Sequence, residues 1–433
     1  MSGRSLDPQL QRNAVRTGGM RASAIRALFA VVNRPEVVSL AGGMPFLDSL
    51  PLEQLAAETG RLLADDGRVA LQYGAGQGIP ELREQICQVM ALEGISAHPD
   101  DVVVTIGSQM ALDLVTRIYC DPGDVILAEA PSYVGALGTF SAYQAQVVHV
   151  ETDDDGLVPA ALEAAIAAVR ESGRRAKLLY TVPNFHNPAG VTLSVDRRAQ
   201  VARICAEAGI TVLEDNPYGL LGFSDTVYPA IRSLDPDNVI YLGSFSKTFA
   251  PGLRVGWVLA PHAVKEKLVL ANESAILNPP MFNQMMISRY LANFDWQSQI
   301  KTYRELYAER RDAMLAALET HMPAGTTWTR PDGGFYVWLT LPEGYDTAAM
   351  LPRAVTERVA YVPGTAFYAD GFGTRQMRLS FCYPTPERIV EGIRRLGTVL
   401  EAEQEMLRTF GVGSVSRPDL RLGGPTAPAP DAV

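Results

Sequence analysis

The stretch GSFSKTFAPGLRVGW, residues 243–257, sets a lysine and an arginine seven residues apart among small and hydroxylated residues. A lysine that is crowded by a fixed cation and partly removed from water has a lowered pKa. Lys247 could therefore act as a neutral amine, which forms Schiff bases with aldehydes. Arg254 suits a phosphate in the same pocket, and Ser244 and Ser246 add hydroxyl donors. A lone lysine is usually a surface charge, so this hypothesis needs support from other motifs.

A second loop could complete a phosphate site. The segment VTIGSQMALDLV, residues 104–115, has the pattern of a strand, a glycine turn and a helix. Backbone amides near Ser108 and Gln109 would be free at the start of that helix, where anions bind. Many strand-to-helix turns share this pattern, so the prediction gains weight only in combination with Arg254.

A carboxylate ends one of the apolar strands. The segment ITVLEDNPYGLL, residues 210–221, closes its apolar run with Glu214 and Asp215. A buried carboxylate is costly unless a cation pairs with it, and a protonated pyridine nitrogen would be such a cation. Tyr218 could donate its phenol to an oxygen on the same ring. The alternative for Asp215 is an ordinary helix N-cap.

Two more side chains could hold a flat ring. Asn187 lies in the Pro-flanked loop PNFHNPAG, residues 183–190, although a plain Asn–Pro turn has the same sequence. Tyr133 follows another strand end and could stack on the ring, or pack as an ordinary tyrosine. An aldehyde-trapping amine, a phosphate cup, a ring-nitrogen carboxylate, ring-oxygen donors and a stacking aromatic together indicate a pyridoxal 5′-phosphate pocket.

The elements that must position these residues form an alternating pattern. Seven short apolar runs are separated by helix-length connections: 101–107, 124–130, 146–151, 177–183, 209–216, 238–244 and 255–261. Such runs predict an α/β fold, in which a mostly parallel seven-stranded sheet lies between two layers of helices. Ligands bind at the carboxyl ends of the strands in such sheets.

The C-terminal part has a different pattern. Residues 296–322 have the pattern of a long amphipathic helix. Three apolar runs and a second long helical pattern follow it, and together they predict a small α+β domain. We expect four regions: an N-terminal arm that contributes to the small domain and the substrate site, a large cofactor-binding domain, the small domain, and a flexible Pro/Gly-rich tail. Their predicted bounds are residues 1–50, 51–300, 301–411 and 412–433.

Composition narrows the function classes. The 433 residues carry a formal net charge of −10, which argues against nucleic acid or an anionic membrane as a partner. Four scattered cysteines predict neither a metal site nor a disulfide framework and fit the cytoplasm. No signal peptide and no membrane-length apolar stretch is recognisable.

Eight motifs in order make residues 21–410 resemble the fold-type I, class I/II pyridoxal-phosphate aminotransferases. The similarity is greatest to the subgroup of 2-aminoadipate and kynurenine/aminoadipate aminotransferases. The motifs are SLAGGMP, LQYGAGQGIPELR, GSQMALDLV, DPGDVILAEAPSYVGAL, PNFHNPAG, EDNPYG, GSFSKTFAPGLRVGW and RLSFCYP.

The resemblance implies a role for each cofactor residue. Lys247 would carry the cofactor and shuttle the proton, with Asp215 on the pyridine nitrogen and Tyr133 stacked on the ring. Asn187 and Tyr218 would bond the ring oxygen. The residues implied to hold the phosphate are Ser108, Gln109, Ser244 and Arg254, and Ser246 is a further predicted cofactor-binding residue, through its hydroxyl.

Besides Asn187, three more residues are implied around the substrate, and one at the cofactor of a neighbouring subunit. Arg378 would grip the α-carboxylate as a fork, and Gly43 would let the backbone approach the substrate. Tyr73 would reach the phosphate in a neighbouring subunit, which implies a homodimer with shared active sites. Arg26 would contact an acidic substrate side chain, although a solvent-facing helix arginine fits equally well.

Two departures from the family pattern lie near the substrate. The loop after AGG reads MPFLDSLP, where relatives commonly carry P-x-P-E-x-F-P, and His186 replaces a phenylalanine or glutamine before Asn–Pro. These changes indicate altered specificity with unchanged chemistry. His186 could bond a polar group of the substrate, or it could be a solvent-exposed turn residue.

The predicted function is the transfer of an amino group between an L-amino acid and 2-oxoglutarate. The amino acid would be aromatic, hydrophobic or similar to 2-aminoadipate, and an arylglycine or another non-proteinogenic amino acid is the alternative. A β-lyase or decarboxylase would use the same Lys–Asp pair. A MocR-type regulator needs an N-terminal DNA-binding domain, and only about twenty polar residues precede the family region, so we do not expect one.

Overall fold

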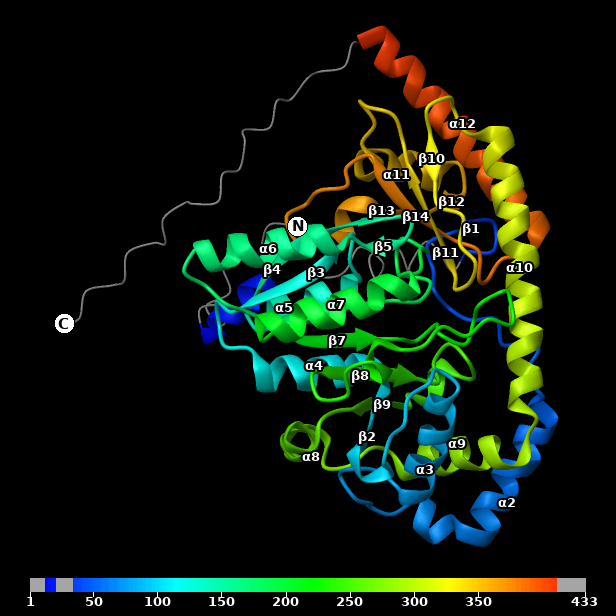
Figure 1. Cartoon of the computed structure of the whole chain (residues 1–433). Coiled ribbons are helices and arrows are strands. Elements are labelled where there is room, and N and C mark those ends of the chain that lie inside the picture. Colours follow the sequence, from blue (N-terminus) through cyan, green and yellow to red (C-terminus); the bar gives the residue numbers. More distant parts are fainter. Residues whose placement is uncertain (1–11, 21–33, 411–433) are drawn as a thin grey trace.

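The computed structural model describes residues 12–20 and 34–410 (Figure 1). Two predictions fall outside these ranges, namely the helix expected at 21–32, with Arg26, and the flexible tail expected at 412–433. The four predicted region boundaries remain predictions.

The larger sheet has eight strands in the order β2-β9-β8-β7-β6-β3-β4-β5. Their bounds are β2 Val102–Thr105, β3 Val125–Ala130, β4 Gln146–Asp153, β5 Gly156–Leu157, β6 Ala176–Thr181, β7 Thr211–Asp215, β8 Val239–Ser244 and β9 Gly256–Leu259. The four central pairings, from β8 through β7, β6 and β3 to β4, are parallel, and the outer three are antiparallel. All seven predicted runs are strands. The predicted number of seven was wrong by one, because β5 has only two residues and no apolar run marks it.

Alternate residues along the strands point to opposite faces, as the pleat requires. On β3, Ile126 and Ala128 belong to the core cluster shared with the helices α4, Gly107–Tyr119, and α5, Val134–Ala142. Val125 and Leu127 belong instead to the cluster shared with α6, Pro159–Glu171, and α7, Val195–Ala208. The sheet is therefore buried on both sides, as the near-continuous apolar runs predicted.

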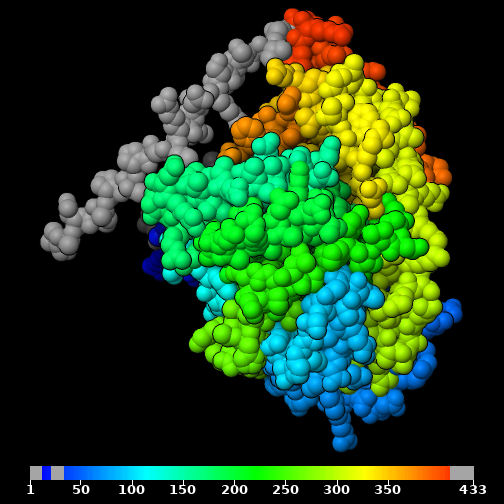
Figure 2. Space-filling view, viewed as in Figure 1, coloured from blue at the N-terminus to red at the C-terminus, as the bar shows by residue number. Residues whose placement is uncertain are grey.

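A four-stranded antiparallel sheet lies above this layer in Figure 1, in the order β10-β11-β14-β13. Its strands are β10 Thr327–Trp328, β11 Tyr336–Thr340, β13 Val362–Pro363 and β14 Gln376–Ser380, and it is accompanied by α11 Thr347–Thr356 and α12 Pro386–Phe410. In the space-filling view of Figure 2, the yellow and orange segments of this part pack directly on the green and cyan ones. A short parallel pairing of β1, Val38–Ser39, with β12, Val359–Ala360, attaches the N-terminal arm to it.

Helix α10, Trp296–His321, runs along one side of the molecule and packs against α12 (Figure 1). It agrees within one residue with the predicted long helix. The remaining α-helices of the described chain are α2 Leu52–Ala70, α3 Pro80–Ala91, α8 His262–Ile276 and α9 Met281–Asn293.

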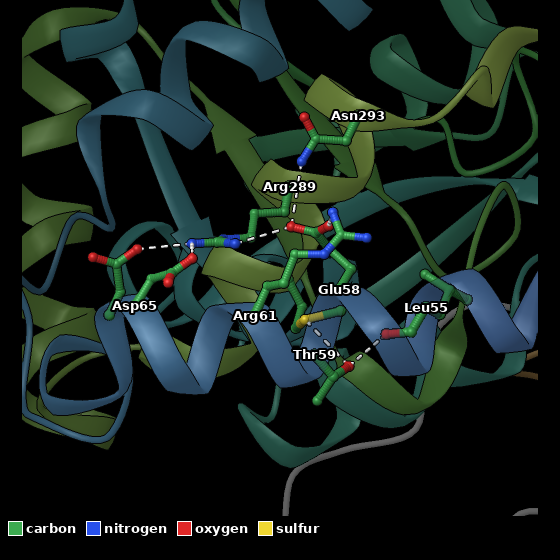
Figure 3. Close-up of polar contacts among 9 residues, drawn as sticks. Leu55, Glu58, Thr59, Arg61, Asp65, Arg289 and Asn293 are labelled. Carbon is green, nitrogen blue, oxygen red and sulfur yellow. Dashed lines mark hydrogen bonds and ion pairs between the residues drawn. The ribbon is translucent and has the colours of Figure 1, made fainter.

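A cluster of charged groups joins α2 to α9 (Figure 3). Glu58 is only 3% exposed, and its two oxygens lie 2.9 Å from Arg289 and from Arg61. Arg289 also reaches Asp66 at 2.8 Å, and the Asn293 amide donates to Glu58. The buried carboxylate is thus surrounded by donors, which offsets the cost of removing it from water.

Candidate active site

A cavity of about 340 Å³ opens at the carboxyl ends of the central strands. It is lined by twelve of the fourteen predicted site residues: Gly43, Ser108, Gln109, Tyr133, Asn187, Asp215, Tyr218, Ser244, Ser246, Lys247, Arg254 and Arg378. Residues as far apart in the sequence as Gly43 and Arg378 meet in this one site. The sequence analysis missed five lining residues: Met44, Tyr180, Val182, Pro217 and Tyr336.

Lys247 lies three residues beyond the end of β8, at the cavity wall. Its Nζ donates a hydrogen bond to the Gly43 carbonyl at 2.8 Å. Burial lowers the pKa of the amine to about 8, and the charges of Arg378 and Arg254 act in the same direction. A fraction of the amine is therefore neutral near physiological pH. Removal from water is the main cause, Cys382 acts against it, and the two neighbouring cations add to it, so both parts of the prediction contribute.

The cup predicted to hold a phosphate is formed by the start of α4 and the loop that carries Arg254. Arg254 adopts the left-handed conformation at φ 52°, and its guanidinium bonds the Ile106 carbonyl and the Ser246 hydroxyl, both at 3.3 Å. Gly107 has a φ of +72°, which favours glycine, and a Cβ atom there would lie 2.4 Å from an Arg254 nitrogen and displace that guanidinium. A fixed cation beside a helix N-terminus is an anion site.

Asp215 ends β7 and is 4% exposed. Tyr180, on the neighbouring parallel strand β6, donates to its Oδ2 at 2.9 Å, while Oδ1 is buried without a partner. Burial raises the pKa of Asp215 to about 6, against the effect of the Tyr180 hydrogen bond. A buried acceptor without a donor is costly, so the site is suited to a ligand that brings an N–H group.

Arg378 is 1% exposed and is held on several sides. One terminal nitrogen donates to Asn187 Oδ1 at 2.9 Å and the other to the Ala41 carbonyl at 2.6 Å, while Nε is buried without a partner. The bond to Arg378 uses the oxygen of Asn187 and leaves its NH₂ group as a donor for the cavity. Arg378 thus offers an unused donor in a dry pocket, which suits a carboxylate.

The comparison with known proteins agrees with this geometry. The family described as "Aminotransferase class I and II" matches residues 35–396. The chain belongs to the class I and II aminotransferases. It is 41% identical to "Aromatic-amino-acid aminotransferase 1" of Thermococcus litoralis, over 89% of this chain and 93% of the relative. It is 38% identical to "2-aminoadipate transaminase" of Thermus thermophilus, over 89% and 95%.

A solved structure is similar over nearly the whole chain. The kynurenine aminotransferase of Pyrococcus horikoshii, solved in complex with PMP, superposes with a TM-score of 0.87 at 39% identity. The match covers 92% of this chain and 99% of the other. The fold is therefore that of the fold-type I pyridoxal-phosphate aminotransferases, as predicted.

Pyridoxal phosphate is the cofactor of this aminotransferase, and the residues present fit it. The free oxygen of Asp215 is an acceptor for a protonated ring nitrogen, the Arg254 cup suits a phosphate, and the Lys247 amine suits an aldehyde. No group of three or more His, Cys, Asp or Glu residues in the described ranges could hold a metal ion. The described helices include none that is long and apolar enough to cross a bilayer.

His186 neither lines the cavity, where it could contact a substrate, nor lies in a solvent-exposed turn. It is 2% exposed, and its Nε2 lies 3.1 Å from a Glu129 oxygen. This approach is a close contact rather than an aligned hydrogen bond. Its Nδ1 accepts a hydrogen bond from the Ala189 amide at 3.2 Å. The imidazole is therefore buried beside Glu129 and does not line the cavity, although the next residue, Asn187, does.

A chain of buried hydrogen bonds runs behind Asp215. Glu93 accepts hydrogen bonds from Tyr241 and from Asn216, the latter at 2.6 Å. Asn216 in turn accepts from Asn184 at 3.0 Å, and Asn184 accepts from Arg198 at 2.6 Å. An acceptor at one end and a donor at the other leave each amide one consistent orientation. No local sequence pattern indicated Glu93, because its partners lie more than 120 residues away.

Tyr73 does not line the cavity of its own chain. It is 77% exposed, beside Leu71, which is 75% exposed. The role predicted for Tyr73 is in a neighbouring subunit, so it remains a prediction.

Proposed function

We propose that this aminotransferase transfers amino groups from aromatic or 2-aminoadipate-like L-amino acids to 2-oxoglutarate. The observation that carries the proposal is the single cavity in which Lys247, Asp215 and Arg378 meet, with an unsatisfied acceptor on Asp215 and an unsatisfied donor on Arg378. The names of the relatives support the substrate class. The aromatic lining, with Tyr133 and Tyr336, supports a flat or long apolar side chain.

Each residue then has one task. Pyridoxal phosphate, when bound, supplies an electron sink for the bonds at the substrate Cα. Asp215 holds the ring nitrogen protonated, because its buried carboxylate gains a cationic partner. Arg378 binds the α-carboxylate with Nε and a terminal nitrogen, a geometry that lysine cannot supply.

Lys247 is the base and acid of the reaction. Its amine has a pKa of about 8 because it is buried, so it can take a proton at one atom and return it at another near neutral pH. The Gly43 carbonyl, which accepts its hydrogen bond, fixes the direction of the amine. Asn187 and Tyr218 orient the ring through its oxygen.

We also propose a cytoplasmic homodimer. Exposed Tyr73 and Leu71 support a subunit interface at this loop, since large exposed apolar groups mark contact surfaces. The free thiols of the four cysteines support a reducing compartment.

The test is a panel of amino donors assayed with 2-oxoglutarate, in which glutamate and the new oxo acid are both quantified. Aromatic amino acids and 2-aminoadipate should yield the two products in equal amounts. Lys247→Ala should abolish turnover and the label that borohydride leaves on the wild-type peptide containing residue 247. An oxo acid formed without glutamate would indicate a lyase, and a borohydride label on another lysine would refute the assignment of Lys247.

A further inference from the structure

Tyr336 is the first residue of β11 and lines the cavity, although no family motif quoted above contains it. Its side chain is 2% exposed. The Arg378 guanidinium carbon lies 4.2 Å from the centre of the Tyr336 ring, and Phe367 is a second ring near the same carbon, at 5.2 Å. A guanidinium against an aromatic face is attracted to it, most strongly when both are removed from water. The Tyr336 ring therefore helps to fix the plane of Arg378.

The hydroxyl of Tyr336 lies in a different contact. The Tyr218 hydroxyl donates to it at 3.5 Å. A Cβ atom on Gly43 would lie 2.1 Å from the Tyr336 oxygen, so the phenol reaches under the same glycine whose carbonyl bonds Lys247. Tyr336 thus contacts two parts of the site through two parts of its side chain.

Both phenols keep their protons. Burial raises the pKa of Tyr218 and of Tyr336 above the ordinary value of a tyrosine. Other titratable or charged groups that influence these two phenols are Tyr133, Arg378 and Cys382, and Lys247 lies across Gly43. Each hydroxyl therefore has one proton to donate and can also accept.

We propose that Tyr336 is a positioning residue of the transamination site, in which its ring holds Arg378 for the substrate carboxylate and its hydroxyl supports Tyr218. The inference rests on the proposed function, in which Tyr218 donates to the oxygen of the cofactor ring. When the single Tyr218 proton is used in that way, the Tyr218 oxygen is left as an acceptor. The Tyr336 hydroxyl then lies within reach as its donor, and such a donor strengthens the bond that Tyr218 makes.

Two substitutions separate the two roles. Tyr336→Phe keeps the ring and removes only the hydroxyl, whereas Tyr336→Leu removes the ring as well. Tyr345→Phe is the matched control, because Tyr345 is also buried and its hydroxyl has no partner among the described residues, but it does not line the cavity. Each holoenzyme is titrated by its near-visible absorbance, and KM and kcat are measured for one aromatic donor.

The sign of the spectral effect follows from the charge on the ring oxygen. A donor to this oxygen stabilises its negative charge and weakens its hold on the proton that it shares with the nitrogen of the lysine link. Tyr336→Phe should weaken the Tyr218 donor and raise the pH midpoint of the absorbance change by about half a unit to one unit, with KM unchanged. Tyr336→Leu should in addition raise KM for the amino donor about tenfold. Tyr345→Phe should change neither quantity.

The outcomes distinguish this inference from the proposed function. If wild type lacks the near-visible absorbance band, the proposed function itself fails. If wild type has the band and Tyr336→Phe leaves the midpoint where it was, the hydroxyl role is refuted. If Tyr336→Leu binds the donor as wild type does, the ring role is refuted.

Discussion

Replacing Glu93 with Gln should make the thermal stability of the aminotransferase less dependent on pH between pH 5 and pH 8. Glu93 is 4% exposed, and burial raises its pKa to about 7 from an ordinary value near 4.5. At any pH between about 4.5 and 7, Glu93 is therefore protonated in the folded state and ionised in the unfolded state. The contribution of Glu93 to the free energy of unfolding is therefore greatest at low pH and is lost as the pH rises through about 7.

The magnitude follows from linkage. A pKa difference of one unit between the folded and unfolded states corresponds to about 1.4 kcal/mol. Because of Glu93, the free energy of unfolding of wild type should therefore fall by about 2 to 3 kcal/mol from pH 5 to pH 8. For 433 residues the entropy of unfolding is about 0.9 kcal/mol/K. The apparent Tm of wild type should therefore fall by about 3 °C relative to Glu93→Gln over this range.

Gln is the appropriate substitution because its oxygen can still accept from Asn216 and its NH₂ group can donate to the Tyr241 hydroxyl, which rotates. Scanning calorimetry at one scan rate, on both proteins at pH 5 and pH 8, measures the difference in Tm. Glu207→Gln is the control, since Glu207 is an exposed partner of Arg203. A Tm difference between wild type and Glu93→Gln that is equal at the two pH values would refute the reasoning.

Two further predictions concern residues of the cavity. Asp215→Asn should reduce turnover by about a hundredfold to a thousandfold while the cofactor stays bound, because an amide cannot stabilise a protonated ring nitrogen as a carboxylate does; turnover and bound-cofactor absorbance measure this, and near-normal turnover would contradict it. Arg378→Lys should raise KM for the amino donor and for 2-oxoglutarate by about tenfold to a hundredfold with the absorbance band unchanged, because a lysine cannot form the two parallel bonds; steady-state kinetics test this, and an unchanged KM for both substrates would exclude Arg378 as the carboxylate site.

Much of the candidate site could be predicted because ligand-binding residues in this fold lie at the carboxyl ends of the parallel strands. Asp215 ends β7 and Lys247 closely follows β8, which pairs in parallel with β7, so the sequence order of the apolar runs was enough to bring them together. Tyr180 was within reach of the same argument, since it is the next-to-last residue of β6, which pairs with β7, and its hydroxyl donates to Asp215.

His186 and Glu93 lay beyond that argument. From the sequence, His186 was expected to contact the substrate or to be exposed to solvent, whereas in the structure it is buried against Glu129. Nothing in the segment ALEGI marks Glu93 as buried, because its environment is made by Asn216 and Tyr241. Polar residues take their roles from partners that are distant in the chain.

The sequence by itself determined the alternation of strands and helices and indicated the amine, the carboxylate and the loops proposed to bind the phosphate, since apolar periodicity and local motifs depend on neighbours in the chain. Only the tertiary structure decided which polar atoms are paired and which are left free for a ligand. The unpaired oxygen of Asp215, the unpaired Nε of Arg378 and the position of Tyr336 result from contacts between segments up to 337 residues apart. Such contacts depend on packing geometry, and no local pattern encodes them.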